Sequence, residues 1–191
     1  MSGKKTRHRR RDEQPGEKVL YDTPLEELWE SRGGFLYVRQ TAGVKRWMRV
    51  ITRPGVPHCG EDVVVFLSGT RSGDETPLGS CRRASHRRRR LGIILLDDPD
   101  PRWMKRLDGV IGRHVPKTFT PRRLRRAWDA YLLEVYLHEL GHWQHIRAGR
   151  EPGEQRADQE AERFAWKWME KLLPREEVLG ALALNWITDI T

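Results

Sequence analysis

The chain has 191 residues, of which 37% are hydrophobic, enough to bury one core of ordinary size but hardly two. Its 36 lysines and arginines outnumber 27 acidic residues, and the formal net charge of +9 excludes an acidic, solvating chain. No apolar run approaches the roughly 18 residues of a membrane-spanning helix, and no apolar stretch follows the basic N-terminus as it would in a secretory signal. Only two cysteines are present, which fits a reducing compartment, so we expect a cytoplasmic protein.

The N-terminal part of the chain divides into two segments. Residues 1–18 hold seven lysines or arginines, three acids and no aromatic residue, a composition typical of a disordered tail. In residues 19–33, Asp22 and Pro24 can begin a helix, and apolar residues three and four positions apart follow them. We predict a disordered basic tail over 1–18, then a single domain over 19–191 that starts with a short helix.

The next segments favour strands. Phe35–Ile51 is rich in aromatic and β-branched residues and is divided by a small turn-like stretch, which predicts a β-hairpin. Val63–Leu67 and Leu91–Leu96 are short apolar runs bounded by glycine, proline or aspartate, as buried strands are. We expect these segments to form a small N-terminal β-sheet.

The second half of the chain has helical periodicity instead. Thr120 is a good N-cap and Gly149 a good C-terminal stop, which predicts one long helix over Pro121–Ala148. A second helix is expected over Glu154–Leu173 and a third over Arg175–Ile187, because prolines separate them. Strands followed by helices indicate an α+β fold with the long helix in a central role.

The long helix contains the pattern H-E-x-x-H, from His138 to His142. Residues four apart lie one above the other on a helix, so the two imidazoles can bind one metal ion, preferably zinc. Both histidines also continue the apolar stripe that begins at Leu124, and buried imidazoles need a partner for each nitrogen, which a metal supplies. Glu139 lies about 100° round the helix, a position suited to a general base and not to a ligand.

A catalytic zinc site normally has a third protein ligand. His145 follows too soon on the same helix to reach the ion that its neighbours bind. On the next helix, Asp158 continues the apolar stripe through Ala161, whereas Glu160 lies on the face that leads to Lys167. Helix phase therefore favours Asp158, with Glu160 as the alternative third ligand.

The H-E-x-x-H pattern, with the motif acidic-x-x-Ala-x-x-Phe-Ala from Asp158 to Ala165, resembles zincin metallopeptidases of the gluzincin type. The resemblance covers about residues 120–173 and is strongest to small intracellular ImmA/IrrE-like proteins and to membrane-associated HtpX-like peptidases. It implies a zincin-like fold in which Asp158 binds zinc and Glu162 is a partner that supports the ligands. The chain has aspartate where those families usually have glutamate, one methylene longer, so Glu160 remains an alternative.

Together these features predict a zinc-dependent metallopeptidase, in which a zinc-activated water attacks the peptide carbonyl and Glu139 takes the proton. The resemblance also implies that a protein or peptide substrate adds to an edge strand, for which Leu91–Leu96 is our candidate. His114, Tyr136 and Arg156 are all possible stabilisers of the oxyanion, and the sequence does not choose among them.

A second class of function depends on the basic runs. The stretch Arg82–Arg90 contains six arginines and no acid, and with the basic tail it could neutralise phosphates, or it could be a solvated loop. The alternative function is therefore a zinc-containing regulatory or nucleic-acid-associated protein whose metal site is structural and not catalytic.

Overall fold

The computed structural model describes residues 35–37, 42–57, 63–72, 78–86, 89–114, 120–150 and 153–190. The basic tail predicted over 1–18 and the short helix predicted within 19–33 lie outside the described residues. The described part contains strands, then helices, with the following bounds: β1 (Phe35–Tyr37), α2 (Ala42–Ile51), β2 (Val63–Ser72), β3 (Gly79–His86), β4 (Arg89–Pro99), α3 (Pro101–His114), α4 (Pro121–Arg147), α5 (Glu154–Leu172) and α6 (Arg175–Ile190).

The four strands form one mixed sheet in the order β1-β2-β4-β3. β2 pairs in parallel with β1 and with β4, so Val65 stands opposite both Phe35 and Ile94. β3 is antiparallel to β4, with Cys81 opposite Ile94, and it is the last of the described strands on that side of the sheet. β2 is paired on both sides, and its apolar run is largely buried, with Val63, Val64, Val65 and Leu67 inaccessible and Phe66 partly buried.

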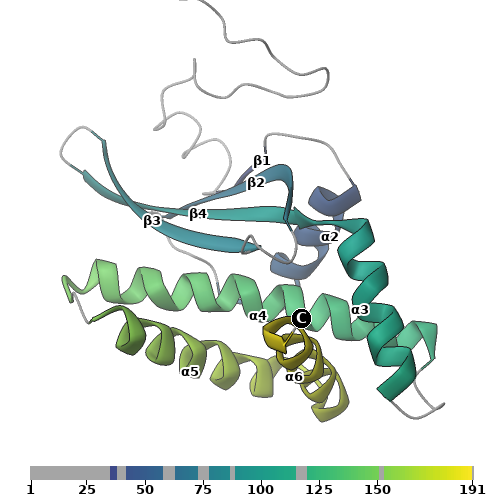
Figure 1. The fold of residues 1–191 in the computed structure, drawn as a ribbon. Coiled ribbons are helices and arrows are strands. Elements are labelled where there is room, and N and C mark those ends of the chain that lie inside the picture. The colour runs from purple at the N-terminus through teal and green to yellow at the C-terminus, as the bar shows by residue number, and fades with distance from the viewer. Residues whose placement is uncertain are drawn as a thin grey trace, which may run out of the picture.

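The helices build further layers under this sheet (Figure 1). α4 runs beneath the sheet and contacts β3 and β4, while α5 and α6 pack on its opposite side. α4 is therefore the central helix of the molecule, and its buried residues lie on nearly all sides, including Leu132, Leu133, Tyr136 and Leu137. The motif with the two histidines therefore lies on a helix that is packed between the sheet and two other helices.

The α+β class, the two apolar strands and the three C-terminal helices are confirmed. Val63–Leu67 lies within β2, Leu91–Leu96 lies within β4, and each of the three C-terminal helices is present with its end moved by one to three residues. The Thr120 side chain accepts a hydrogen bond from the backbone N–H of Arg123, as an N-cap does. Gly149 follows the helix with a φ of 67°, the left-handed conformation expected of a glycine stop.

The hairpin predicted over Phe35–Ile51 is wrong. Of the described residues in this range, 35–37 form a strand and 42–51 form α2, which lies in the crossover that parallel pairing with β2 requires. Trp47, Val50 and Ile51 are buried at helical spacing, so tertiary packing outweighs the strand propensity of these residue types. Trp47 also donates a hydrogen bond from Nε1 to the carbonyl of Asp97 (2.9 Å), which attaches α2 to the end of β4.

The sequence analysis missed α3 and β3. α3 has a recognisable start, because the Asp100 carboxylate accepts a hydrogen bond from the backbone N–H of Arg102 and Pro101 occupies the first turn. Its buried residues, Trp103, Leu107 and Ile111, follow one another at intervals of four. β3 occupies much of the arginine-rich stretch, so the solvated-loop interpretation of that stretch is wrong.

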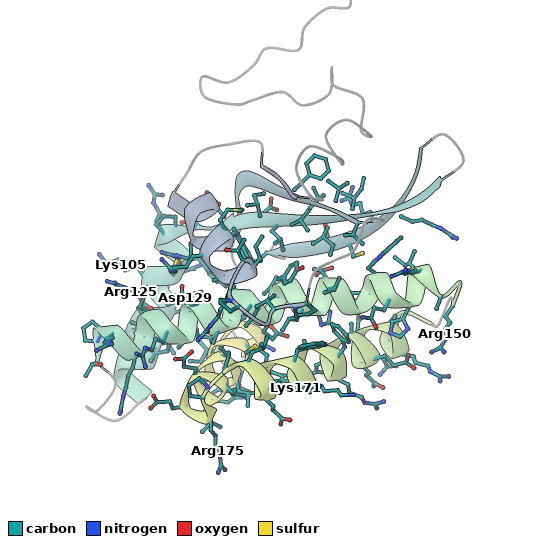
Figure 2. The ribbon with its side chains drawn as sticks, turned by 180° about the vertical axis from the view of Figure 1, so that it is seen from behind. Lys105, Arg125, Asp129, Arg150, Lys171 and Arg175 are labelled. Atoms are coloured by element: carbon teal, nitrogen blue, oxygen red, sulfur yellow. The ribbon has the colours of Figure 1, made fainter. Side chains whose placement is uncertain are left out.

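The exterior is strongly charged. Lys105 points outward from α3, Arg150 from the turn that follows α4, and Arg175 from the start of α6 (Figure 2). No helix within the described ranges combines the length and the apolar character needed to cross a membrane.

Candidate metal centre

The two histidines of the motif face each other one turn apart on α4. Their Nε2 atoms lie 3.0 Å apart and their rings are inclined by 79°. Both rings are partly buried, and the side chain of His142 is 22% exposed. The pair therefore lies at the edge of the core, where an external molecule can reach it.

A close helix crossing brings the third group to this pair. A Cβ atom placed on Gly141 would lie only 2.8 Å from the Cα of Ala161, so α4 and α5 approach here nearly backbone to backbone. Asp158 lies one turn before Ala161 on α5, and its Oδ1 is 3.2 Å from Nε2 of His142. The small residues at the crossing thus explain why Asp158 reaches the histidines.

The three donor atoms suit one small cation. The two Nε2 atoms and a carboxylate oxygen of Asp158 all lie within 4.8 Å of one another. Ligands at about 2.0–2.1 Å from a tetrahedral zinc ion are roughly 3.3 Å apart, close to the 3.0 and 3.2 Å found here. Asp158 is 58% exposed, so it can adjust its side chain, but the expectation that it is buried is wrong.

The other acids on α5 occupy different positions. Glu160 accepts a hydrogen bond from Nε of Arg156 (2.9 Å), and its second oxygen lies 3.4 Å from Nδ1 of His145. The hydrogen bond from Arg156 lowers the pKa of Glu160. The structure therefore brings Asp158, and not Glu160 or His145, to the histidine pair, while Glu162 is exposed and close enough for its charge to favour the protonated form of His138.

Glu139 packs against β3 and lies near enough to Asp158 for the two carboxylate charges to interact. It is 8% exposed and packs against the backbone of β3, since a Cβ on Gly79 would lie 2.9 Å from its Cγ and 3.0 Å from its Oε1. Its carboxylate accepts a backbone hydrogen bond from Cys81. Burial, and secondarily the negative charge of Asp158, raise the pKa of Glu139 to about 7.

The same environment controls the other titratable groups. Burial lowers the pKa of His138, and the neighbouring imidazole of His142 lowers it further. Burial also lowers the pKa of His142. Both rings are therefore neutral near pH 7, the form that binds metal ions. Burial raises the pKa of the Cys81 thiol to about 12, so this side chain is a neutral packing group beside Glu139.

Two of the three suggested oxyanion stabilisers have other roles. Tyr136 is fully buried and donates its hydroxyl hydrogen to the carbonyl of Pro57 (3.1 Å), while Arg156 binds Glu160. The side chain of the third, His114, lies outside the described residues.

Comparisons with protein-family models, with curated proteins and with solved structures give no match for this chain. The resemblance to zincin metallopeptidases thus stays a prediction that depends on the motif residues, and the geometry of the site carries the functional argument.

Proposed function

We propose that this chain is a zinc-dependent metallopeptidase with a zincin-like site, in which His138, His142 and Asp158 bind the metal and Glu139 is the general base. The observation that supports the proposal most strongly is the convergence of three ligand atoms within 4.8 Å, on two helices, beside a buried carboxylate. Zinc bound by these residues would polarise a peptide carbonyl and lower the pKa of water toward about 7.

Glu139 has the properties of a proton shuttle. Burial raises the pKa of Glu139 to about 7 in the metal-free protein, and the charge of a bound zinc ion would lower it, so the carboxylate would be ionised and able to take a proton from water. The hydrogen bond from the Cys81 backbone fixes one side of the carboxylate, and the close contact with Gly79 leaves the side chain little freedom to rotate. The group is therefore oriented before any substrate binds.

The proposed substrate strand is β3, which replaces the strand predicted from sequence. Leu91–Leu96 belongs to β4, which is paired on both sides by β2 and β3 and so has no edge to offer. β3 is the outermost of the described strands, and Cys81, the third residue of β3, donates a backbone hydrogen bond to the proposed base. A peptide in extended conformation that pairs with β3 would place its backbone beside the histidines.

The openness of the site favours catalysis over a structural metal. A structural zinc site has four protein ligands and is closed to solvent. Here Asp158 is 58% exposed. Among the described residues, three side chains form the candidate metal site and no fourth His, Cys, Asp or Glu joins them. A free coordination position is what hydrolysis requires.

A peptide-library assay tests the proposal. A tryptic digest of a whole proteome is incubated with the wild type and with Glu139→Gln, and new termini are identified by mass spectrometry. We expect cleavage by the wild type, its loss on chelation and return with zinc, and a loss of at least a hundredfold in Glu139→Gln with zinc retained. Equal cleavage by both proteins would contradict the role of Glu139.

A further inference from the structure

α6 exposes a second distinctive surface, far along α4 from the histidines. Leu179, Leu182 and Trp186 are 54%, 42% and 65% exposed, and they are the large exposed hydrophobic residues of the described chain. With Ala183 they form one stripe on the helix, at spacings of three, one and three residues. The opposite face of α6, including Ala181 and Leu184, is buried, so this helix is apolar on both sides.

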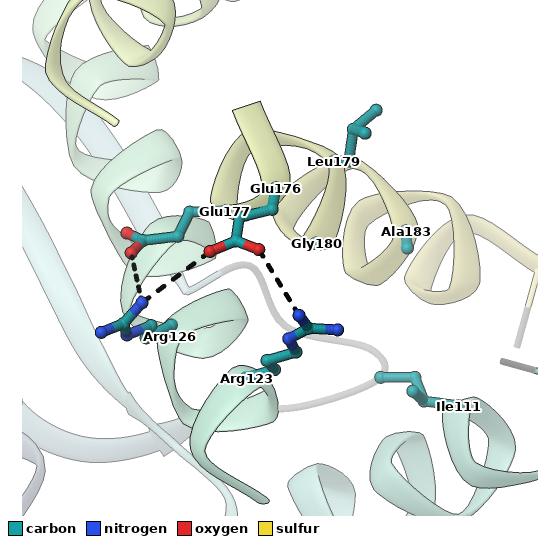
Figure 3. Close-up of a pocket in the computed structure, with 8 residues that line it drawn as sticks. All are labelled: Ile111, Arg123, Arg126, Glu176, Glu177, Leu179, Gly180 and Ala183. Carbon is teal, nitrogen blue, oxygen red and sulfur yellow. Dashed lines mark ion pairs between the residues drawn. The ribbon is translucent and has the colours of Figure 1, made fainter. Parts of the chain in front are cut away.

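A cavity of about 280 Å³ adjoins this stripe. Leu179, Gly180 and Ala183 form its wall on α6, and Ile111 closes it from α3 (Figure 3). The lining is mainly apolar, and the cavity has room for a side chain as large as an indole. α6 thus carries a protruding tryptophan and, two turns before it, an apolar hollow.

We infer that the α6 face, defined by Leu179, Leu182, Ala183 and Trp186, pairs two copies of this chain around a two-fold axis. A two-fold interface brings the same surface of both copies together, so this surface must be complementary to itself. The α6 face meets this condition because it carries both an exposed tryptophan and a cavity that can receive one. With antiparallel helices and the axis between positions 182 and 183, Trp186 of one copy faces Leu179 of the other at the mouth of the cavity. Each lies about 5 Å along the helix from the axis.

The charges around the cavity permit this contact. Each copy carries a net charge of +9, so two copies repel each other over most of their surface. At the cavity, however, Glu176 lies 3.9 Å from both Arg123 and Arg126, and these acid-base pairs neutralise the rim (Figure 3). An apolar centre with a mixed, polar rim is the usual composition of a protein interface.

The exposed apolar side chains supply part of the area that a dimer interface needs. The exposed parts of the two leucines and of Trp186 amount to roughly 350 Å² per copy, and the rim adds to this. A standard interface buries about 800 Å² per partner, so the three side chains supply close to half. Tryptophan at the centre of an interface is among the residues that contribute most to binding.

Sedimentation equilibrium on the full chain, from about 1 to 100 μM and in about 0.3 M salt to screen repulsion, tests the inference. We expect a species of twice the 22.5 kDa chain mass, with or without a chelator. Leu182→Glu and Leu182→Arg should each weaken the dimer at least tenfold. An equimolar mixture of the two should form a heterodimer, because position 182 lies next to the axis and the opposite charges meet there.

Gln155→Glu and Gln155→Arg, on the exposed start of α5, are matched controls and should leave the dimer unchanged. Circular dichroism shows whether each variant is folded, and Trp186→Ser is a second test that introduces no charge. A wild type that stays at the mass of one chain up to about 100 μM would overturn the inference. A dimer that neither Leu182 variant weakens would also overturn it, since another face would then mediate the association.

Discussion

Gly141 on α4 and Ala161 on α5 touch at a helix crossing that leaves no room for a β-carbon at position 141, which would lie 2.8 Å from the Cα of Ala161. Gly141 lies next to His142, and Ala161 lies one turn after Asp158, whose Oδ1 is 3.2 Å from Nε2 of His142. The distance between α4 and α5 at this crossing therefore determines how close Asp158 lies to the histidines.

Gly141→Ala should push the two helices apart. Because the new atom meets backbone, and not the end of a flexible side chain, we expect a loss of about 1–3 kcal/mol in the free energy of unfolding, together with weaker zinc binding. Gly109→Ala on α3 is the control, since nothing lies within 4 Å of a β-carbon there. It should stabilise the protein by about 0.5–1 kcal/mol. Chemical denaturation measures both, and a neutral Gly141→Ala would contradict the account of the crossing.

Metal-free Glu139→Gln should be more stable than the wild type at alkaline pH. The pKa of Glu139 rises from 4.5 to about 7 on folding, so the ionised side chain destabilises the folded protein. This penalty is absent below about pH 4.5, grows as the pH rises to about 7 and is constant above that. The variant should gain up to about 3 kcal/mol at pH 8 and at most about 1 kcal/mol at pH 5.

Urea denaturation at both pH values, with a chelator present, measures this difference. Glu170→Gln, an exposed position on α5, controls for the exchange of carboxylate for amide. If Glu139→Gln differs from the wild type by the same amount at pH 5 and at pH 8, the carboxylate is not destabilised by burial.

Thr120→Ala should weaken the start of α4 without changing the metal site. The Thr120 hydroxyl accepts a 3.3 Å hydrogen bond from the Arg123 backbone, at the end of the helix remote from the histidines. We expect a loss of about 0.5–1 kcal/mol in thermal or chemical unfolding, with unchanged zinc content. Loss of zinc in this variant would mean that the two ends of α4 are coupled.

Much of the helical half could be predicted from sequence, because its signals are local. Thr120, Gly149 and the prolines between helices mark the ends, and the pattern from His138 to His142 identifies the face. Helix phase also favoured Asp158 over Glu160, and the structure brings Asp158 to the histidines. Short apolar runs identified β2 and β4 because buried parallel strands are apolar throughout.

The order of strands in the sheet could not be predicted, because it depends on contacts between distant segments. β3 contains Arg82 and Arg83, both exposed, and its composition resembles a loop until its antiparallel pairing with β4 is known. The identity of the edge strand was therefore missed, and with it the contacts of Gly79 and Cys81 with Glu139. α2 was missed because aromatic and β-branched residues favour strands until burial at helical spacing decides otherwise.

The metal content of the purified protein tests the central claim most directly. Elemental analysis, after purification without chelators, compares the wild type with His142→Ala, Asp158→Ala and Glu160→Ala. The account predicts about one zinc ion per chain in the wild type and in Glu160→Ala, and its loss in the other two variants. A wild type without zinc, or Asp158→Ala with a full complement of zinc, would contradict it.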